Sequence, residues 1–190
     1  MAILKKESTR RILGRRWFLA LAFFVIASIG TGIAANAQQS LEYLVKGAYL
    51  YKFGDFVEWP PSAFPEPESP FVVGVLGKDP FGPDLDAIVQ GRTIQGRPVV
   101  IRRFAQVNEV RNAHILYIGT TRTINLEQIL ARLRNTSILT VSDESRGPVG
   151  IINFIMVGSK VRFEIYPKAA TRAGLKVSSK LLDVAEVVGN

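Results

Sequence analysis

Few residues of this chain have the types and spacing that acid–base or nucleophilic catalysis needs. His114 is the single imidazole, and no cysteine is present to act as a nucleophile or thiolate ligand. Because His114 opens an apolar stretch, we expect a buried ring whose nitrogens bond to backbone groups. A second histidine or a cysteine that could complete a zinc site is missing from the sequence. The sequence therefore predicts a protein that is not an enzyme, with no catalytic residue, metal site or cofactor.

Carboxylate pairs are the remaining candidates for acid–base work. They are Asp84/Asp86, Glu66/Glu68 and Asp143/Glu144. The first pair lies where a helix is expected to start, so its charge complements the helix dipole, and the second lies in a proline-rich connection. The third pair follows an apolar strand, and loops after strands often carry function in α/β sheets. We predict that Asp143 and Glu144, with Arg146 in the same loop, contact a binding partner.

Positive charge is distributed unevenly along the sequence. Six of the 24 Lys and Arg residues lie within residues 1–37, so the net charge of +8 says little about the remainder. Residues 97–134 hold seven arginines: Arg97, Arg102, Arg103, Arg111, Arg122, Arg132 and Arg134. A solvated face is the ordinary explanation, but guanidinium groups also bind carboxylates and phosphates. We predict that Arg102 and Arg103 contact a partner with an acidic patch or a lipid head group, and that no nucleic acid binds.

Aromatic side chains precede the Pro60-Pro61 bend. If Phe56 and Trp59 are exposed, they are candidate anchors of a protein interface. The alternative is that both rings pack onto the sheet, and the sequence leaves this choice open.

Hydrophobic patterning predicts the elements that position these residues. We expect a first helix from about Ser40 that buries Leu41, Leu44, Val45 and Ala48, and then an irregular connection. Strands are predicted at 71–77, 98–104, 114–119 and 138–141, with a hairpin formed by 151–157 and 160–165. Helices are predicted at 84–89, from the Asn125 cap, from Pro167 and from Ser178 or Ser179. Gly77–Gly82 is interpreted as a strand-to-helix turn because it lacks the glycine pattern of a phosphate loop.

The alternation of strands and helices through residue 141 predicts parallel pairing, to which the later hairpin adds antiparallel strands. The expected fold is therefore a single three-layer-like α/β domain over residues 38–190. Its sheet should be mixed, mostly parallel and Rossmann-like, with helices flanking it.

Residues 1–37 have the layout of a secretory signal: a basic stretch, the apolar run Trp17–Ile29 and a tail of small residues. The apolar run is short for a membrane span. We therefore predict a signal peptide cleaved after Ala37 and export to the periplasm. Retention of the leader as an anchor stays open, as does export by the general or the twin-arginine route.

Several sequence blocks, taken in order, resemble the YfiR family of periplasmic proteins. The blocks are Lys46–Phe53, Phe56–Pro60, Val75–Gly82, Leu139–Asp143, Gly150–Phe154, Val161–Ile165 and Ala169–Leu182. The resemblance covers nearly all of residues 40–188. Family members often carry a cysteine before the histidine of the strand at 113–118, where this chain has Ala113, so disulfide-based redox control is not carried over.

The resemblance implies a periplasmic regulator that binds the periplasmic region of an inner-membrane diguanylate cyclase and represses it, thereby controlling cyclic di-GMP signalling and biofilm formation. It also implies a Rossmann-like fold, a homodimer and an outer-membrane lipoprotein as a possible antagonist. The alternative is a periplasmic small-ligand binding or transport accessory domain that uses the loops Gly77–Gly82 and Ser142–Gly150.

Overall fold

The computed structural model describes residues 38–119, 125–143 and 148–189. The chain divides into two units, residues 1–41 and 42–190, and the first is described only over 38–41, which are helical. In the second unit the first helix runs from residue 42 to residue 56. The elements that follow are β1 (Val57–Glu58), η1 (Pro61–Ala63), β2 (Phe71–Gly77), α2 (Pro83–Val89), β3 (Thr93–Ile94), β4 (Arg97–Phe104), η2 (Val107–Glu109), β5 (Ile115–Gly119), α3 (Leu126–Arg132), β6 (Leu139–Ser142), β7 (Ile152–Val157), β8 (Lys160–Ile165), α4 (Pro167–Arg172), β9 (Lys176–Val177), α5 (Ser179–Leu182) and β10 (Glu186–Val187).

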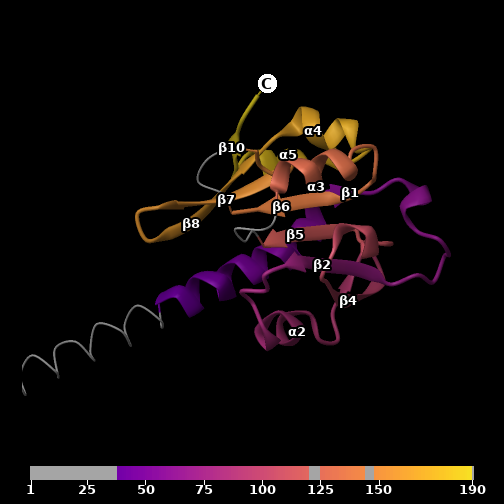
Figure 1. The fold of residues 1–190 in the computed structure, drawn as a ribbon, viewed down its shortest axis with the longest axis horizontal. Coiled ribbons are helices and arrows are strands. Elements are labelled where there is room, and N and C mark those ends of the chain that lie inside the picture. The colour runs from indigo at the N-terminus through magenta and orange to yellow at the C-terminus, as the bar shows by residue number, and fades with distance from the viewer. Residues whose placement is uncertain (1–37, 120–124, 144–147, 190) are drawn as a thin grey trace, which may run out of the picture. The chain divides into compact units, whose positions relative to one another are not determined.

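The main sheet has eight strands in the order β10-β8-β7-β6-β5-β2-β4-β3 (Figure 1). Its five central strands, β7, β6, β5, β2 and β4, are all parallel to their neighbours within that set. The β7–β8 hairpin and the short β3 add antiparallel pairs, while β10 pairs in parallel with β8. A second, two-stranded sheet joins β1 to β9. This topology confirms the predicted mixed, mostly parallel sheet.

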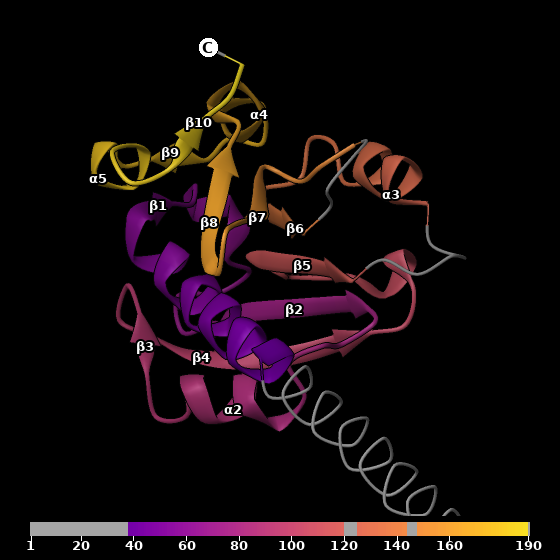
Figure 2. The ribbon, with the colours of Figure 1, turned by 90° about the vertical axis from the view of Figure 1, so that its left-hand side faces the viewer.

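Strand β2 shows why the domain has layers. It is a continuous apolar run, and all of its residues except Gly77 are buried. Phe71, Val73 and Val75 belong to the core beneath the first helix and α2, whereas Val72 and Leu76 belong to a second core beneath α3. Helices therefore cover both faces of the sheet, and the first helix crosses one face in Figure 2. The three-layer-like α/β fold is confirmed.

The first helix differs from its prediction in both length and buried face. It continues to residue 56, through a segment expected to be irregular, and Gly54 lies within it close against Ile94. Its buried face carries Lys46, Leu50 and Phe53, at helical spacing. The predicted face is wrong: Leu44 is 43% exposed and Val45 is 37% exposed.

The other predicted helices and strands are confirmed with small shifts of their ends. Asn125 caps α3 by accepting a hydrogen bond from the Gln128 backbone N–H at 3.2 Å. Ser178 caps α5 in the same way through the Lys180 N–H at 3.2 Å. Gly158 takes the positive φ of 62° that the β7–β8 turn requires. Among the described residues, no helix has the length and apolar character needed to span a membrane.

Candidate functional site

The exposed side of the first helix forms one wall of an apolar groove. The groove has a volume of about 370 Å³. It is lined by Val45, Ala48, Tyr49, Lys52, Phe53, Phe56, Phe163, Leu181 and Val184. These residues come from the first helix, β8 and the α5 region, so segments far apart in the sequence build one surface. We call this surface the apolar groove.

Aromatic packing fixes the floor of the apolar groove. The rings of Phe53 and Phe163 lie 5.1 Å apart and edge to face, and the rings of Tyr49 and Phe163 lie 5.5 Å apart. Phe53 also stacks on Phe154 at 5.8 Å. Such contacts hold large rings in fixed orientations. The floor is consequently a rigid apolar surface anchored to β7 and β8.

The rim of the apolar groove remains open to solvent. Val184 is 60% exposed and Val45 is 37% exposed, while Leu44 beside the groove is 43% exposed. Among the described residues of the lining, only Lys52 is charged, and its ammonium group pairs with Asp55 at 3.1 Å. Apart from the phenol of Tyr49, no histidine, carboxylate or hydroxyl group is among the described residues that line the groove. Its chemistry suits contact with an apolar protein surface rather than catalysis.

Asp143 lies in a different place, directly after β6. Its carboxylate accepts hydrogen bonds from Lys46 Nζ and from the Tyr43 hydroxyl, each at 3.2 Å. Lys46 is itself buried, and its ammonium group also pairs with Glu42 at 2.6 Å. The side chain of Asp143 is only 14% exposed. The carboxylate that the sequence suggested for a partner therefore ties the first helix to the carboxyl end of β6.

Two tyrosines near Asp143 are held in their neutral form. Burial first, and then the negative charge of Asp143, raises the pKa of Tyr43 to about 12. The same causes, in the same order, raise the pKa of Tyr117. Neither phenol therefore ionises near neutral pH. Among the described residues there is no group of three or more His, Cys, Asp and Glu side chains able to hold a metal ion.

A chain of polar side chains crosses the sheet next to Asp143. The Ser142 hydroxyl donates to Asn153 Oδ1 at 2.9 Å, and Asn153 Nδ2 donates to Glu164 Oε2 at 3.1 Å. Gly150 N–H donates to Ser142 Oγ at 2.9 Å. These bonds join β6, β7 and β8 in register. Polar residues from three of the sequence blocks described above, Leu139–Asp143, Gly150–Phe154 and Val161–Ile165, therefore bond to one another within the sheet.

Arg103 is occupied by internal contacts. Its Nε donates to Asp79 at 2.7 Å, and its two terminal nitrogens bind the Asp86 carboxylate at 3.2 and 2.5 Å. One of them also donates to the Gly82 carbonyl at 2.8 Å. The Asp79 carboxylate accepts from the Phe81 and Gly82 N–H groups as well. Gly77–Gly82 is thus the predicted strand-to-helix turn. The Asp79 carboxylate accepts from backbone N–H groups that would otherwise be available to bind a phosphate.

Trp59 packs into the core. It is 8% exposed, its ring meets Phe71 edge to face at 4.9 Å, and its Nε1 donates to the His114 carbonyl at 3.2 Å. Of the two possibilities that the sequence left open, exposed anchor or packed ring, Trp59 is the packed ring, because little of it faces solvent. Phe56, in contrast, is half-buried and lines the apolar groove.

His114 is the structural histidine that the sequence predicted. The ring is buried between Phe64 and Phe71, with centroids 4.3 and 4.8 Å away. Its Nδ1 accepts from the Val72 N–H at 3.0 Å, and its Nε2 lies 3.2 Å from the Ala63 carbonyl, to which it can donate as the neutral tautomer. Burial lowers its pKa to about 4.

The predicted partner-binding residues do not form one site. Phe56 lines the groove, Asp143 and Arg103 are engaged internally, and Arg102 is exposed on β4. Glu144 and Arg146 lie outside the described residues.

The groove residues that the sequence interpretation missed include Val45, Phe163, Leu181 and Val184. A signal was available in the first helix, which is apolar on two faces. A helix of that kind has to be covered on both sides or to offer one side to a partner.

A family model described as YfiR/HmsC-like matches residues 43–186. The matched range contains the apolar groove, the Asp143 cluster and almost the whole sheet. It confirms the resemblance that the sequence blocks indicated. No curated protein matches the chain.

Proposed function

The chain belongs to the YfiR/HmsC-like family, and from this premise we propose that it represses an inner-membrane diguanylate cyclase by binding the cyclase's periplasmic region. The family is one of periplasmic regulators of diguanylate cyclases, and it is regulatory rather than catalytic. Repression would lower cyclic di-GMP and with it biofilm formation. The leader, residues 1–37, would serve as the export signal, cleaved after Ala37.

The observation that carries this proposal is the apolar groove. Exposed valines stand on its rim over a rigid aromatic floor, and exposed apolar surface of this kind marks protein–protein contacts. Its size suits the insertion of a few apolar side chains of a partner. At the edge, the Lys52 ammonium group is paired with Asp55, so the groove offers mainly apolar surface to a partner.

Two further features of the proposal rest on the family alone. We propose that the chain forms a homodimer and that an outer-membrane lipoprotein antagonises its binding to the cyclase. Antagonism by competition would require the lipoprotein to cover the same groove. The groove variants below would then weaken both complexes.

The experiment measures binding of the purified full chain to a detergent-solubilised inner-membrane diguanylate cyclase from the same organism, together with the rate of cyclic di-GMP synthesis. We expect the wild-type chain to bind and to lower this rate. Val45→Glu and Val184→Glu should each weaken binding at least about 30-fold, because a buried carboxylate in an apolar contact is unpaired.

Val157→Glu is the matched control. Val157 is 52% exposed at the end of β7 and does not line the groove. The control should therefore bind as tightly as the wild type. An unchanged synthesis rate with wild-type chain at saturating concentration would refute repression, whereas equal weakening by all three variants would refute the groove as the contact.

A further inference from the structure

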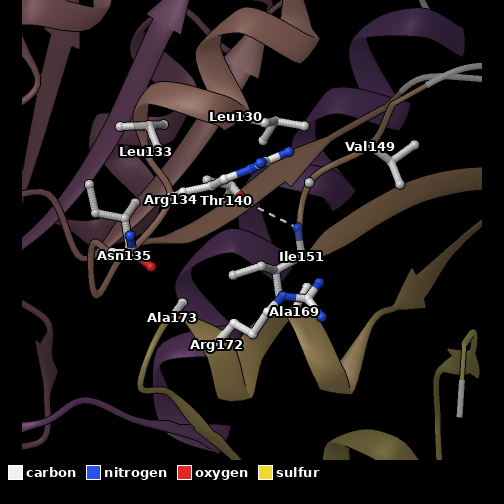
Figure 3. Close-up of a pocket in the computed structure, with 12 residues that line it drawn as sticks. Leu130, Leu133, Arg134, Asn135, Thr140, Val149, Ile151, Ala169, Arg172 and Ala173 are labelled. Carbon is white, nitrogen blue, oxygen red and sulfur yellow. Dashed lines mark hydrogen bonds between the residues drawn. The ribbon is translucent and has the colours of Figure 1, made fainter.

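A second cavity lies on another part of the molecule, between α3 and α4. It has a volume of about 460 Å³, within the range of pockets that hold small molecules. We call it the α3–α4 pocket. Figure 3 shows Leu130 and Leu133 on the α3 side, Ala169 and Ala173 on the α4 side, and Thr140 and Ile151 between them. None of these residues lines the apolar groove, so the two sites are separate.

The interior of the α3–α4 pocket is mostly apolar. Leucine, isoleucine, valine and alanine side chains make up most of its walls. Asn135 adds an amide to the arginines and Thr140, and no Asp or Glu is among its described lining residues. Thr140 supplies one hydroxyl, whose oxygen accepts the Ile151 N–H at 3.0 Å. The hydroxyl proton is then available to a bound acceptor.

Two arginines stand on opposite walls of the pocket. Arg134 follows α3 and Arg172 ends α4, and in Figure 3 both side chains extend alongside the space that Thr140 and Ile151 border. Neither guanidinium group has a hydrogen bond or ion pair within the part of the chain that the structure describes. Arg103 is held by Asp79 and Asp86. Arg97 is held by the carbonyls of Pro67 and Ser69, at 2.7 Å each.

A favourable interaction with the helix dipole accounts for Arg172, in the last turn of α4, but not for Arg134, which follows α3. Arg132, in the last turn of α3, meets that need, and it lines a different surface depression. Arg134 and Arg172 instead both line one cavity, Arg134 on its α3 side and Arg172 on its α4 side. Two guanidinium groups beside an apolar wall match a molecule with an anionic head and an apolar body.

We propose that the α3–α4 pocket binds a small organic anion, with its carboxylate or phosphate between Arg134 and Arg172 and its apolar body against Leu130, Ile151 and Ala173. The Thr140 hydroxyl donates to the same head group. This binding does not depend on the cyclase, so it can be tested apart from the proposed repression.

The test uses isothermal titration calorimetry on the purified full chain with three probes. They are 3-phenylpropionate, its neutral amide 3-phenylpropanamide, and phenyl phosphate. We expect one molecule of 3-phenylpropionate to bind per chain. The neutral amide should bind at least about tenfold more weakly, since it lacks the charge that the guanidinium groups recognise. Comparison of the carboxylate with the phosphate identifies the preferred head group.

Variants locate the binding site. Arg134→Gln and Arg172→Gln should each weaken binding of the preferred anion about tenfold, while Arg132→Gln should leave it unchanged. Ala173→Leu fills the pocket without changing its charge and should abolish binding. Thermal melts of every variant confirm that it is folded before it is titrated.

Failure of both anions to bind at millimolar concentration would overturn the proposal. So would binding that Arg134→Gln and Arg172→Gln leave unchanged, because the anion would then lie elsewhere. Binding of a short acidic peptide but of neither small anion would assign the pocket to a protein partner and would also overturn it.

Discussion

Lys46 Nζ lies 3.2 Å from Asp143 Oδ2, which joins the buried side of the first helix to the carboxyl end of β6. The ammonium group sits between two carboxylates, because Glu42 pairs with it at 2.6 Å. The Lys46 side chain is 4% exposed. These buried charged groups therefore fix one side of the first helix on the sheet. The opposite side of the helix remains free to form the apolar groove.

Removing the buried ammonium group should destabilise the fold. We expect Lys46→Met to lower the free energy of unfolding by about 3 kcal/mol, because Asp143 and Glu42 would lose their partner in a poorly solvated place. Lys52→Met, at the exposed pair with Asp55, is the control and should change it by less than about 1 kcal/mol. Urea unfolding measures both, and similar losses would mean that the buried pair has no special role.

His114 should make stability depend on pH. Its pKa is about 4 in the folded chain against an ordinary 6.5, so the unfolded chain binds more protons between these values. The stabilisation from the neutral ring is complete above about pH 6.5 and is lost as the pH falls toward 4. The fall in pKa from 6.5 to about 4 corresponds to about 3 kcal/mol.

The measurement for His114 is unfolding free energy from pH 7 to pH 4 in the wild type and in His114→Gln. The variant should be less stable at pH 7, because the Val72 N–H loses a well-placed acceptor, but it should vary less with pH. Carboxylates titrate equally in both proteins, so the difference isolates the histidine. Parallel curves would contradict its assignment as a neutral buried ring.

Much of the fold could be predicted from local patterns. The run Phe71–Gly77 is apolar throughout, which requires burial on both faces and hence helices on both sides of the sheet. Asn125 and Ser178 mark helix starts by a side-chain bond that depends only on near neighbours. His114, as a polar residue in an apolar strand, was correctly expected to bond to backbone.

The site was harder to predict because it depends on which side of the first helix meets the sheet. Leu44 and Val45 are as apolar as Leu50, and nothing local to the helix shows that Lys46 is buried by Asp143, about a hundred residues away. The groove also needs Phe163 and Val184, which only the folded chain brings to the helix. The ion pairs of Arg103 with Asp79 and Asp86 were likewise not visible in the sequence, because the fold brings these residues together from separate elements.

Asp79 should be important to the turn between β2 and α2. Its carboxylate accepts the N–H groups of Phe81 and Gly82 at 2.8 and 3.1 Å and pairs with Arg103 at 2.7 Å. We expect Asp79→Ala to lower the free energy of unfolding by about 2 kcal/mol, as loss of a capping carboxylate does. Asp84→Ala is the control in the same region. Equal stability of the two variants in urea would show that the turn forms without its side-chain bonds.

Gly54 should resist replacement although it lies within a helix. A Cβ there would stand 2.5 Å from Ile94 Cδ1 and 2.8 Å from its Cγ2, and Ile94 is fully buried. Alanine improves helix propensity by about 1 kcal/mol, but overpacking a buried contact costs about 1–3 kcal/mol. We therefore expect Gly54→Ala to be net destabilising. Gly47→Ala, whose nearest neighbour is the flexible end of Ile88 at 3.0 Å, should be neutral or stabilising.

A double variant separates crowding from any other effect of Gly54→Ala. Ile94→Val removes the atom closest to the new methyl group, so combining the two changes should recover at least about 0.5 kcal/mol relative to the sum of the single losses. Thermal or urea unfolding of the four proteins gives this coupling. Additive losses would show that the first helix does not press on Ile94.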